Sequence, residues 1–535
     1  MNASNTVIRQ RTFKDIRATL LERQEIALLD VREEHTHAQA HPLFAANLPL
    51  SCIEVDAYTK LPRRNVPIVT LDDGEGYAEV ATQRLISLGY TNVSVLAGGV
   101  SGWQEAGGEL FRDVNVPSKA FGELVEAERH TPSLSAEEVQ ALIDAKSDMM
   151  IVDARRFDEY QTMSIPTATS VPGAELVLRV RVLAPSPQTS VIVNCAGRTR
   201  SIIGTQSLIN TNLPNPVFAL RNGTIGWKLA GQNLDHGQTR SYVNIAESSR
   251  LVVAEEAHRL SDKAGVKRVH LDEIPGWASQ EFRTSYFLDV RSPEEYVTGH
   301  LPGFRSVPGG QLVQETEMFA PVRGARIALS DSDGVRANMS ASWLAQMGWE
   351  VFVVDGAVPV DFCEKGFWQQ PLPPMPAVKK ISPATLNDWL DRPEKIVVLD
   401  VSPSTHYRQA HIPGAWFVLR SNLAKDWHHI PTAKHYVVTC KTGILSHFAA
   451  TELELLVAGS GAEVVVLKGG TEAWRTSGFP QESGLTHLAS EPIDRYRRPY
   501  EGTDNPREAM QAYLDWEFGL VEQLAKDGTH HFSVL

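Results

Sequence analysis

One unit recurs four times along this chain of 535 residues, and the repeat constrains the fold more than any other sequence feature. Each unit has an apolar run that ends in aspartate, a second apolar run that enters a loop, and a glycine turn after a third run. A repeat of this kind indicates one supersecondary unit used several times. The spacing from the aspartate to the residue that opens the loop is 42 residues in three units and 40 in the fourth. The aspartates are Asp30, Asp153, Asp289 and Asp400, and the loops open at Asp72, Cys195, Asp331 and Cys440.

Short β-branched runs alternate with amphipathic stretches inside each unit. Residues 68–71 and 93–96 are typical of strands, and residues 79–88 between them are typical of an amphipathic helix. Such alternation indicates a mostly parallel sheet covered by helices on both faces. The predicted fold class is therefore α/β, with four tandem domains and a C-terminal helical tail. We predict the domains at residues 10–115, 131–235, 266–370 and 377–482, and the tail at residues 483–535.

Composition and charge exclude several classes of protein. The chain is 42% hydrophobic and 21% charged, as is ordinary for globular proteins. Its net charge of −13 argues against a nucleic-acid partner, because neutralising phosphates requires clustered Lys and Arg. No apolar run approaches the roughly 20 residues that span a bilayer, so we expect no membrane partner. An N-terminus without an apolar core and four widely spaced cysteines favour a reducing cytoplasm.

The tail is predicted to contain a helix over about residues 505–524. We expect its apolar side chains to dock on a neighbouring domain rather than to form a site for a partner. These side chains are Met510, Tyr513, Leu514, Trp516, Phe518 and Leu520.

The loop of the second unit, residues 195–201, contains the residues that are the best candidates for catalysis. Cys195 lies where a predicted strand gives way to a helix predicted over residues 200–210. A helix N-terminus or a nearby cation lowers a cysteine pKa from about 8.5 to roughly 3.5–7.5. Loop amides and the helix dipole would also hold an oxyanion in front of the sulfur. We therefore interpret this loop as a site where a thiolate meets an anion.

These landmarks resemble those of the rhodanese superfamily of sulfurtransferases, over most of residues 15–480. The resemblance rests on Asp289-Val-Arg-Ser-Pro-Glu-Glu-Tyr296, on His-Leu-Pro-Gly at His300, on His-Ile-Pro-Gly-Ala at His411, and on the closing Gly-Gly-x-x-x-Trp. It implies five-stranded parallel α/β domains in which the active cysteine opens the loop after the fourth strand. It also implies that this cysteine takes the outer sulfur from a donor as a persulfide and passes it to cyanide or another thiophilic acceptor.

With this resemblance, Cys195 is the predicted nucleophile and its loop is the predicted substrate-binding site. Arg198 and Arg200 are the predicted anion clamps, because a guanidinium binds a sulfonate-like group through two hydrogen bonds and keeps its charge. Gly197 would let the loop curve so that its N–H groups point inward. Thr199 and Ser201 are predicted to donate hydroxyl hydrogen bonds to the persulfide or the donor. The complete predicted substrate-binding set is Ala196, Gly197, Arg198, Thr199, Arg200 and Ser201.

The other three loops depart from this pattern. Asp72 and Asp331 put a carboxylate at the cysteine position, where it would repel an anionic donor, so we predict that these units serve as scaffold. Cys440 keeps the thiol, but Lys441 is its only loop cation, which makes a second working thiol the less favoured interpretation.

Two further residues of the second unit have structural interpretations. Arg155 has counterparts in units without a thiol, so a structural ion pair is favoured over catalysis. Trp227 shares its register with tryptophans of two other units, which favours core packing. The 17 histidines show no HxxH or HExxH clustering, so neither a metal site nor a cofactor is predicted.

The predicted reaction moves a sulfane sulfur from a small anionic donor to a cyanide or thiol acceptor, with a protein thiol as a further option. Two arginines suit the thiosulfate dianion better than 3-mercaptopyruvate. The alternatives are a non-enzymatic persulfide carrier, a multi-domain interaction scaffold and, least favoured, a phosphatase or arsenate reductase. The last two need five residues between cysteine and arginine, whereas four separate Cys195 from Arg200.

Overall fold

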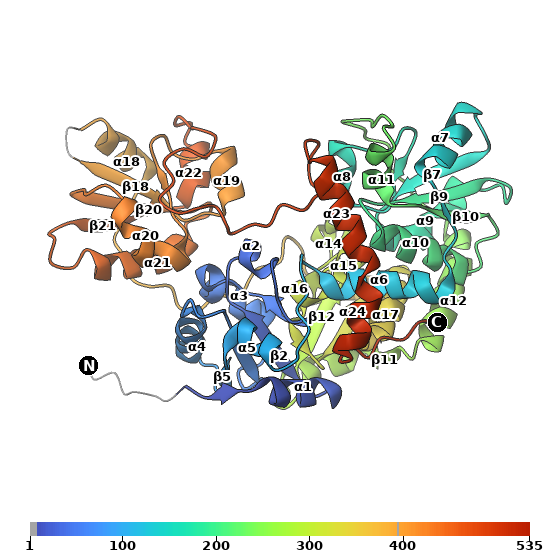
Figure 1. The fold of residues 1–535 in the computed structure, drawn as a ribbon, viewed down its shortest axis with the longest axis horizontal. Helices are drawn as coiled ribbons and strands as arrows, with labels where there is room; N and C mark the ends of the chain where they lie inside the picture. The colour runs from blue at the N-terminus through green and yellow to red at the C-terminus, as the bar shows by residue number, and fades with distance from the viewer. Residues whose placement is uncertain (1–7, 393–394) are drawn as a thin grey trace.

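The computed structural model describes residues 8–392 and 395–535, which form four α/β units and a helical tail (Figure 1). Each unit has a central sheet with helices packed against both faces, and each repeats one strand order, first-fifth-fourth-second-third in sequence. The α/β fold class predicted from the repeat is therefore confirmed. Unit 1 contains β1 (Gln10–Arg11), α1 (Phe13–Leu21), β2 (Ile26–Asp30), α2 (Glu34–His37), β3 (Ala46–Asn47), α3 (Ile53–Lys60), β4 (Ile68–Leu71), α4 (Tyr77–Ser87), β5 (Val93–Leu96) and α5 (Gly99–Glu105).

Unit 2 follows after a connecting helix, α6 (Val116–Arg129). It begins with a short strand and a helix whose N-terminus has a capping box, with both reciprocal hydrogen bonds formed between Ser135 and Glu138. Its elements are β6 (Ser133–Leu134), α7 (Ala136–Asp144), β7 (Met149–Asp153), α8 (Phe157–Thr162), β8 (Thr169–Ser170), α9 (Leu176–Leu183), β9 (Ser190–Asn194), α10 (Thr199–Asn210), β10 (Val217–Leu220) and α11 (Gly223–Leu229).

Unit 3 is joined to unit 2 by the long helix α12 (Glu247–Lys263). Its elements are β11 (Lys267–His270), α13 (Ile274–Ala278), β12 (Ser285–Asp289), α14 (Pro293–Thr298), β13 (Arg305–Ser306), α15 (Gly309–Gln314), α16 (Thr316–Phe319), β14 (Val322–Arg323), β15 (Arg326–Ser330), α17 (Arg336–Gln346) and β16 (Glu350–Asp355).

Unit 4 follows a proline-rich linker, and its first helix has an N-cap at Ser382, which accepts a hydrogen bond from the Thr385 N–H, with Pro383 at the first helical position. Its elements are β17 (Lys380–Ile381), α18 (Pro383–Leu390), β18 (Ile396–Asp400), α19 (Ser404–Gln409), β19 (Trp416–Phe417), α20 (Leu423–Asp426), β20 (His435–Thr439), α21 (Leu445–Leu456), β21 (Glu463–Leu467) and α22 (Gly470–Thr476).

One strand leaves its own unit. The segment β14 of unit 3 pairs antiparallel with β2 of unit 1, with Val322 opposite Ala27 and Arg323 opposite Ile26. The sheet of unit 1 therefore has six strands, of which β14 is antiparallel, whereas the family resemblance implies five parallel strands. Because side chains of units 1 and 3 also share one large apolar cluster, these two units form a joint core.

The segment between units 1 and 2 is a helix, although it contains a proline. Pro117 lies in the first turn of α6, where the ring is tolerated because that turn's N–H groups have no intrahelical partner. Phe121 and Val125 enter the joint core of units 1 and 3, and α6 packs along α10 of unit 2. The connecting segment is thus a structural element of the site described below.

The tail runs back from unit 4 to unit 2 and ends in two helices, α23 (Arg507–Phe518) and α24 (Leu520–Asp527) (Figure 1). The single helix predicted there is divided at Gly519, which caps one helix and begins the next. The predicted docking is confirmed for most of the apolar residues, whereas Phe518 is 55% exposed. The buried ones are Met510, Tyr513, Leu514 and Leu520.

Candidate active site

All four units place one side chain at the end of the fourth strand, where backbone N–H groups of the next helix face it. In unit 1, Asp72 Oδ2 accepts hydrogen bonds from the N–H groups of Tyr77 at 2.7 Å and Ala78 at 3.1 Å. In unit 3, Asp331 Oδ2 accepts one from the Ala337 N–H at 2.7 Å. Helix N-terminal amides stabilise negative charge through their partial charges and the helix dipole. This anion cradle, as we call it, therefore already holds a carboxylate in two units.

Cys195 occupies the anion cradle of unit 2 and is 1% exposed. Its Sγ donates a hydrogen bond to Ser201 Oγ at 3.4 Å, and the Ser201 N–H points at the sulfur from the cradle position filled by Ala78 and Ala337 in the other units. Ser201 Oγ in turn donates to the Arg198 carbonyl at 2.8 Å. Of the predicted substrate-binding residues, Ser201 is thus in direct contact with the thiol.

The glycine turn after the last strand holds the loop from behind. The Thr224 N–H donates to the Cys195 carbonyl at 2.9 Å, and the Ile225 N–H donates to the Ala196 carbonyl at 3.0 Å. Gly223 has a φ of +54°, and a Cβ there would lie 2.4 Å from the Cys195 oxygen. Only glycine fits this position, which explains why the turn recurs with the loop in the sequence.

The pKa of the Cys195 thiol is raised, contrary to the sequence expectation of a lowered value. Burial is the largest cause, and it outweighs the Arg200 charge and the Ser201 hydrogen bonds, which both act to lower the pKa. The position of the thiol beside a helix N-terminus was predicted correctly from the sequence. The burial of this thiol under other parts of the chain was not. The thiolate needed for sulfur chemistry must therefore form against this desolvation.

Arg200 is engaged by a carboxylate of its own unit. Its Nη1 and Nη2 donate to Glu159 at 2.7 and 3.0 Å, which raises the pKa of the guanidinium and lowers the pKa of Glu159 to about 2 despite burial. Arg336 and Glu295 form the equivalent pair in unit 3, whose loop has no thiol. The pair therefore has a structural role, although Arg200 is also the largest charge acting on Cys195.

Arg198 points away from the thiol and into the connecting helix α6. Its Nε and Nη2 donate to Glu123 at 2.7 and 2.8 Å, and its Nη2 also contacts Glu126. The guanidinium lies 4.2 Å from the centre of the Phe518 ring of the tail. With its side chain 3% exposed and two carboxylates bound, Arg198 ties the loop to α6 and the tail. That it also binds the donor remains a prediction, and the geometry favours Arg200 for that role.

The tail helix α23 covers the Cys195 loop. Ala196 and Ile225 pack in one apolar cluster with Tyr500, Met510 and Tyr513. A Cβ at Gly197 would lie 3.3 Å from both Glu517 Oε2 and a Tyr513 ring carbon, so the missing side chain allows the close approach of α23. This contact joins residues more than 300 positions apart in the sequence.

Glu517 is the ionisable group that the tail brings to this loop. It is 1% exposed, its Oε1 accepts a hydrogen bond from the Tyr513 hydroxyl at 2.7 Å, and its Oε2 has no hydrogen-bond partner. Burial raises the pKa of Glu517 to about 8, and the nearby Glu123 carboxylate adds to the rise. A neutral carboxyl group thus faces the loop at neutral pH.

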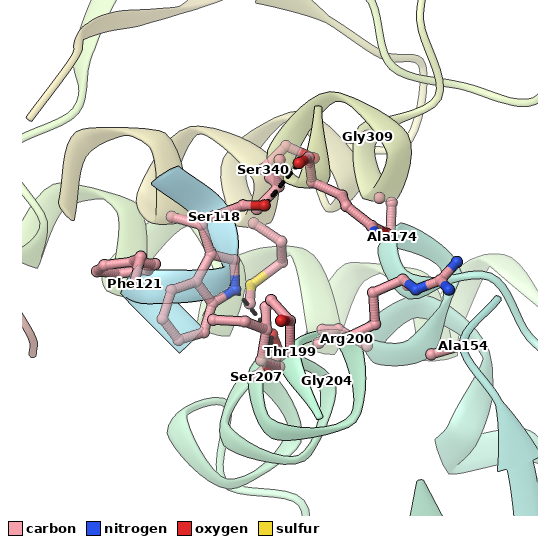
Figure 2. Close-up of a pocket in the computed structure, with 18 residues that line it drawn as sticks. Ser118, Phe121, Ala154, Ala174, Thr199, Arg200, Gly204, Ser207, Gly309 and Ser340 are labelled. Atoms are coloured by element: carbon pink, nitrogen blue, oxygen red, sulfur yellow. Dashed lines mark hydrogen bonds between the residues drawn. The ribbon is translucent and has the colours of Figure 1, made fainter. Parts of the chain in front are cut away.

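Thr199 faces the junction with α6 rather than the sulfur. A Cβ at Gly122 of α6 would lie 2.9 Å from Thr199 Cγ2, so the two backbones pack closely here. Thr199 also lines a small, mainly apolar cavity of about 50 Å³ between units 2 and 3 (Figure 2). In Figure 2 the Arg200 side chain runs sideways, away from the centre of this cavity. A space of this size holds a few waters at most, and its mainly apolar lining does not suit an anionic donor.

A polar cavity of about 220 Å³ lies on the other side of Arg200. Side chains from three parts of the chain line it: Arg155, Arg156 and Glu159 of unit 2, Gln314 of unit 3, and the tail. The tail residues that line it are Arg495, Arg498, Tyr500, Glu501 and Gly502. The sequence could not show that the tail and unit 3 would face the Cys195 loop.

The structural roles predicted for two other residues are confirmed. Arg155 Nε and Nη2 donate to Asp153 at 2.9 and 2.7 Å, and Nη2 also donates to the Met163 carbonyl. Equivalent pairs occur in units 1 and 3. Trp227 is fully buried in the core of unit 2.

Cys440 occupies the anion cradle of unit 4 in the same way as Cys195. The Ser446 N–H points at its sulfur, and Ser446 Oγ donates to the Gly443 carbonyl at 2.9 Å. Burial raises the pKa of this thiol also. Leu445 stands where unit 2 has Arg200, and Lys441 is exposed. The cradle is thus conserved between the two units, whereas the charges around it are not.

Across residues 8–392 and 395–535, no three His, Cys, Asp or Glu side chains are grouped as a metal site would need. In the same ranges no helix combines the length and apolar character that crossing a bilayer requires. All four cysteines are free thiols.

Comparisons with known proteins agree with the repeat. The family model described as "Rhodanese-like domain" matches residues 14–106, 135–230, 275–359 and 382–477, once in each unit. The chain is similar to the crystal structure of thiosulfate sulfurtransferase from Pseudomonas aeruginosa, with 63% identity, a TM-score of 0.97, and coverage of 99% of this chain and 100% of that chain. It is also 32% identical over 96 residues to the probable adenylyltransferase/sulfurtransferase MoeZ from two strains of Mycobacterium tuberculosis. That match covers 18% of this chain, which spans 24% of the length of those curated relatives.

Proposed function

The chain belongs to the rhodanese-like domain family, and from this membership we propose that it is a sulfurtransferase with one working thiol, Cys195. One observation carries the assignment to unit 2. Among the four loops, that of unit 2 alone combines a thiol in the anion cradle with an arginine at the fifth position after it. Units 1 and 3 fill the cradle with their own carboxylates, and unit 4 has no arginine in its loop.

The first half-reaction loads sulfur on Cys195. The thiolate attacks the outer sulfur of the donor, the donor's S–S bond breaks, and with thiosulfate the bonding electrons leave on sulfite. The persulfide left behind is an anion, and the cradle N–H groups that hold Asp72 and Asp331 are in the right register to hold it. Arg200 offsets part of the repulsion between a thiolate and an anionic donor.

Thiosulfate is the donor we propose. The similar protein from Pseudomonas aeruginosa is a thiosulfate sulfurtransferase, and its likeness extends over the whole chain. The positive charge of Arg200, which acts on the Cys195 thiol, also suits an anionic donor. The second half-reaction transfers the outer sulfur to cyanide or a thiol and regenerates the Cys195 thiolate.

Mass measurement on the two candidate thiols tests this assignment. After incubation with thiosulfate, the peptide that contains Cys195 should carry one added sulfur, and the Cys440 peptide should not. Cys195→Ser should abolish thiocyanate production, whereas Cys440→Ser, the matched control in the same cradle position, should leave it unchanged. Loss of activity only in Cys440→Ser would move the working site to unit 4.

The same experiment distinguishes an enzyme from a carrier. A carrier would accept one sulfur on Cys195 and show no turnover with small acceptors. Turnover that survives both substitutions would contradict persulfide transfer through either loop.

A further inference from the structure

A cavity of about 580 Å³ lies between units 1 and 3, and the sulfur-transfer mechanism does not use it. Its lining comes from residues 62–65 and Thr91 of unit 1 and from within residues 277–287 of unit 3. Small-molecule sites typically measure about 300–1,000 Å³ and often lie where domains meet. The size and position of this space, which we call the interunit cavity, are therefore those of a ligand site.

Cationic side chains gather at the interunit cavity and share few carboxylates. Arg63 and Arg283 line the cavity and pair with the two oxygens of Glu25 at 2.7 and 3.0 Å. Arg283 also shares Glu350 with Lys267, at 2.5 and 2.8 Å. Two acids thus bind three cations.

Arg64 also lines the cavity, and in the described part of the chain it has no carboxylate partner. Its Nη1 donates to the Leu61 carbonyl at 3.1 Å and to the Tyr90 hydroxyl at 2.9 Å. Its guanidinium lies 3.6 Å from the centre of the Tyr58 ring, which holds the group in place. Among the described residues, none accepts a hydrogen bond from Nε or Nη2. This edge of the guanidinium can bind two oxygens of one anion through parallel hydrogen bonds.

Arg326 adds a further charge behind the wall of the cavity. It donates to Ser285 Oγ at 2.7 Å and to Gln280 Oε1 at 2.5 Å, and both of these residues line the cavity. Burial and the nearby Arg283 charge lower the pKa of Arg326, and the carboxylates around it do not cancel this effect. Glu281, which is exposed, is a further carboxylate among the lining residues. Five cations and three acids therefore surround the cavity, which leaves an excess of two positive charges.

Aromatic side chains form an apolar part of the wall. Trp277 and Phe287 line the cavity and are both half-buried. The Trp277 ring is held by the Arg326 guanidinium, 3.7 Å from the ring centre, and by a T-shaped contact with Phe352 at 4.7 Å. The Phe287 ring packs against Phe304. The two lining rings are thus positioned before a ligand binds, and they offer apolar contact to a flat ring.

We propose that the interunit cavity is a second binding site of this protein, and that its ligand is a small aromatic phosphate. The excess of two positive charges matches a phosphate dianion, and the open edge of Arg64 binds its oxygens. Trp277 and Phe287 contact the aromatic ring. An inorganic anion lacks the ring and a neutral ring lacks the charge, so each alone binds more weakly. The site needs no persulfide on Cys195.

Calorimetric titration with phenyl phosphate, inorganic phosphate and phenol tests the two parts of this assignment. Phenyl phosphate should bind the wild-type protein about tenfold more tightly than inorganic phosphate, because it also buries an aromatic ring. It should also bind more tightly than phenol, which lacks the charge. Absence of phenyl phosphate binding would refute the site, and equal affinity for phenyl phosphate and inorganic phosphate would refute the aromatic ligand class.

Two variants assign the binding to this cavity. Arg64→Gln should weaken the binding of phenyl phosphate and of inorganic phosphate about tenfold each, as for loss of a charge-assisted hydrogen bond. Trp277→Ala should weaken phenyl phosphate about tenfold and leave inorganic phosphate unchanged. Arg129→Gln, at an exposed position in the last turn of α6, is the control and should bind as the wild type does. Wild-type affinity for phenyl phosphate in both Arg64→Gln and Trp277→Ala would contradict the assignment.

Thiosulfate kinetics separate the interunit cavity from the Cys195 loop. Arg64→Gln and Trp277→Ala should both produce thiocyanate at the wild-type rate, which also shows that the variants are folded. At a phenyl phosphate concentration that saturates the wild type, KM for thiosulfate should stay unchanged. A competitive rise in this KM that persists in Arg64→Gln would place the phosphate in the Cys195 loop and overturn the proposal.

Discussion

The carboxylates of Asp72 and Asp331 identify the physical property that the Cys195 loop shares with its counterparts. In each unit the sixth residue after the loop-opening position directs its N–H at the group in the cradle. The cradle is thus a property of the fold, and the chemistry depends on which atom the sequence places there. A carboxylate makes it a helix cap, whereas a thiol makes it a nucleophile that the same amides stabilise as an anion.

This view predicts that Asp72 stabilises unit 1. Asp72→Ala removes the acceptor for the N–H groups of Tyr77 and Ala78, so we expect a loss of about 1–2 kcal/mol in the free energy of unfolding, as for other helix caps. Urea denaturation of the variant and the wild type measures this loss of free energy. Asp72→Asn keeps an acceptor oxygen and should lose less, and an unchanged unfolding midpoint in Asp72→Ala would contradict the capping role. Thiosulfate loading of Cys195 should not change.

At the scale of elements, the site depends on two helices that the repeat does not contain. The connecting helix α6 binds Arg198 through Glu123, and the tail helix α23 covers Gly197. The alternation of strands and helices, the loop and its place before the next helix followed from local patterns, since β-branched runs and glycine turns act over a few residues. The packing of α6 and α23 on the loop could not be predicted, because residues 195–201 carry no local signal for the distant segments that pack on them. The predicted lowering of the Cys195 pKa was wrong for the same reason, since the burial that raises this pKa comes from that packing.

Glu517 makes docking of α23 dependent on pH. Because burial raises its pKa from 4.5 to about 8, the folded protein holds one more proton than the unfolded chain between these values. Stability should therefore fall as pH rises through this window, by up to about 1.4 kcal/mol per pH unit. The charged and titratable groups around Glu517 are Glu123 and Lys119 of α6, Arg198 of the loop, and Tyr513 of its own helix.

Glu517→Gln should remove this slope. We expect the urea midpoint of the variant to change less between pH 6 and pH 8 than the urea midpoint of the wild type. Glu508→Gln, at an exposed position of the same helix, is the control and should keep the wild-type slope. Parallel slopes for Glu517→Gln and the wild type would show that Glu517 is not the titrating group.

At the scale of the whole molecule, units 1 to 3 and unit 4 are built differently. Units 1 and 3 share a core that also includes residues of α6 and α10, whereas the two apolar clusters of unit 4 contain only residues between 378 and 493. Polar contacts join unit 4 to unit 1. Arg420 of unit 4 lies at their centre, 2.5 and 2.8 Å from the Glu54 oxygens of unit 1 and 2.6 Å from Glu452.

We therefore expect two calorimetric transitions, one for unit 4 and one for the rest. Arg420→Ala should lower the midpoint of the unit 4 transition, because Arg84 alone is then left to pair with the Glu54 and Glu452 carboxylates. The other midpoint should change less, and Arg475→Ala, on the surface of unit 4, should change neither. A single transition that moves as a whole in Arg420→Ala would contradict separate cores.

The pairing of β14 of unit 3 with the sheet of unit 1 has a consequence for biosynthesis. On the ribosome, β2 emerges about 290 residues before β14, the segment that pairs with its outer edge. At translation rates of about 5–20 residues per second, the part of this edge at Ile26 and Ala27, which β3 does not cover, stays open for roughly 15–60 s. An open strand edge is a template for pairing with other chains. The nascent N-terminal unit should therefore depend on chaperones until unit 3 has been made. All strands in the sheet of unit 4 come from unit 4 itself, so this unit can fold as soon as it emerges.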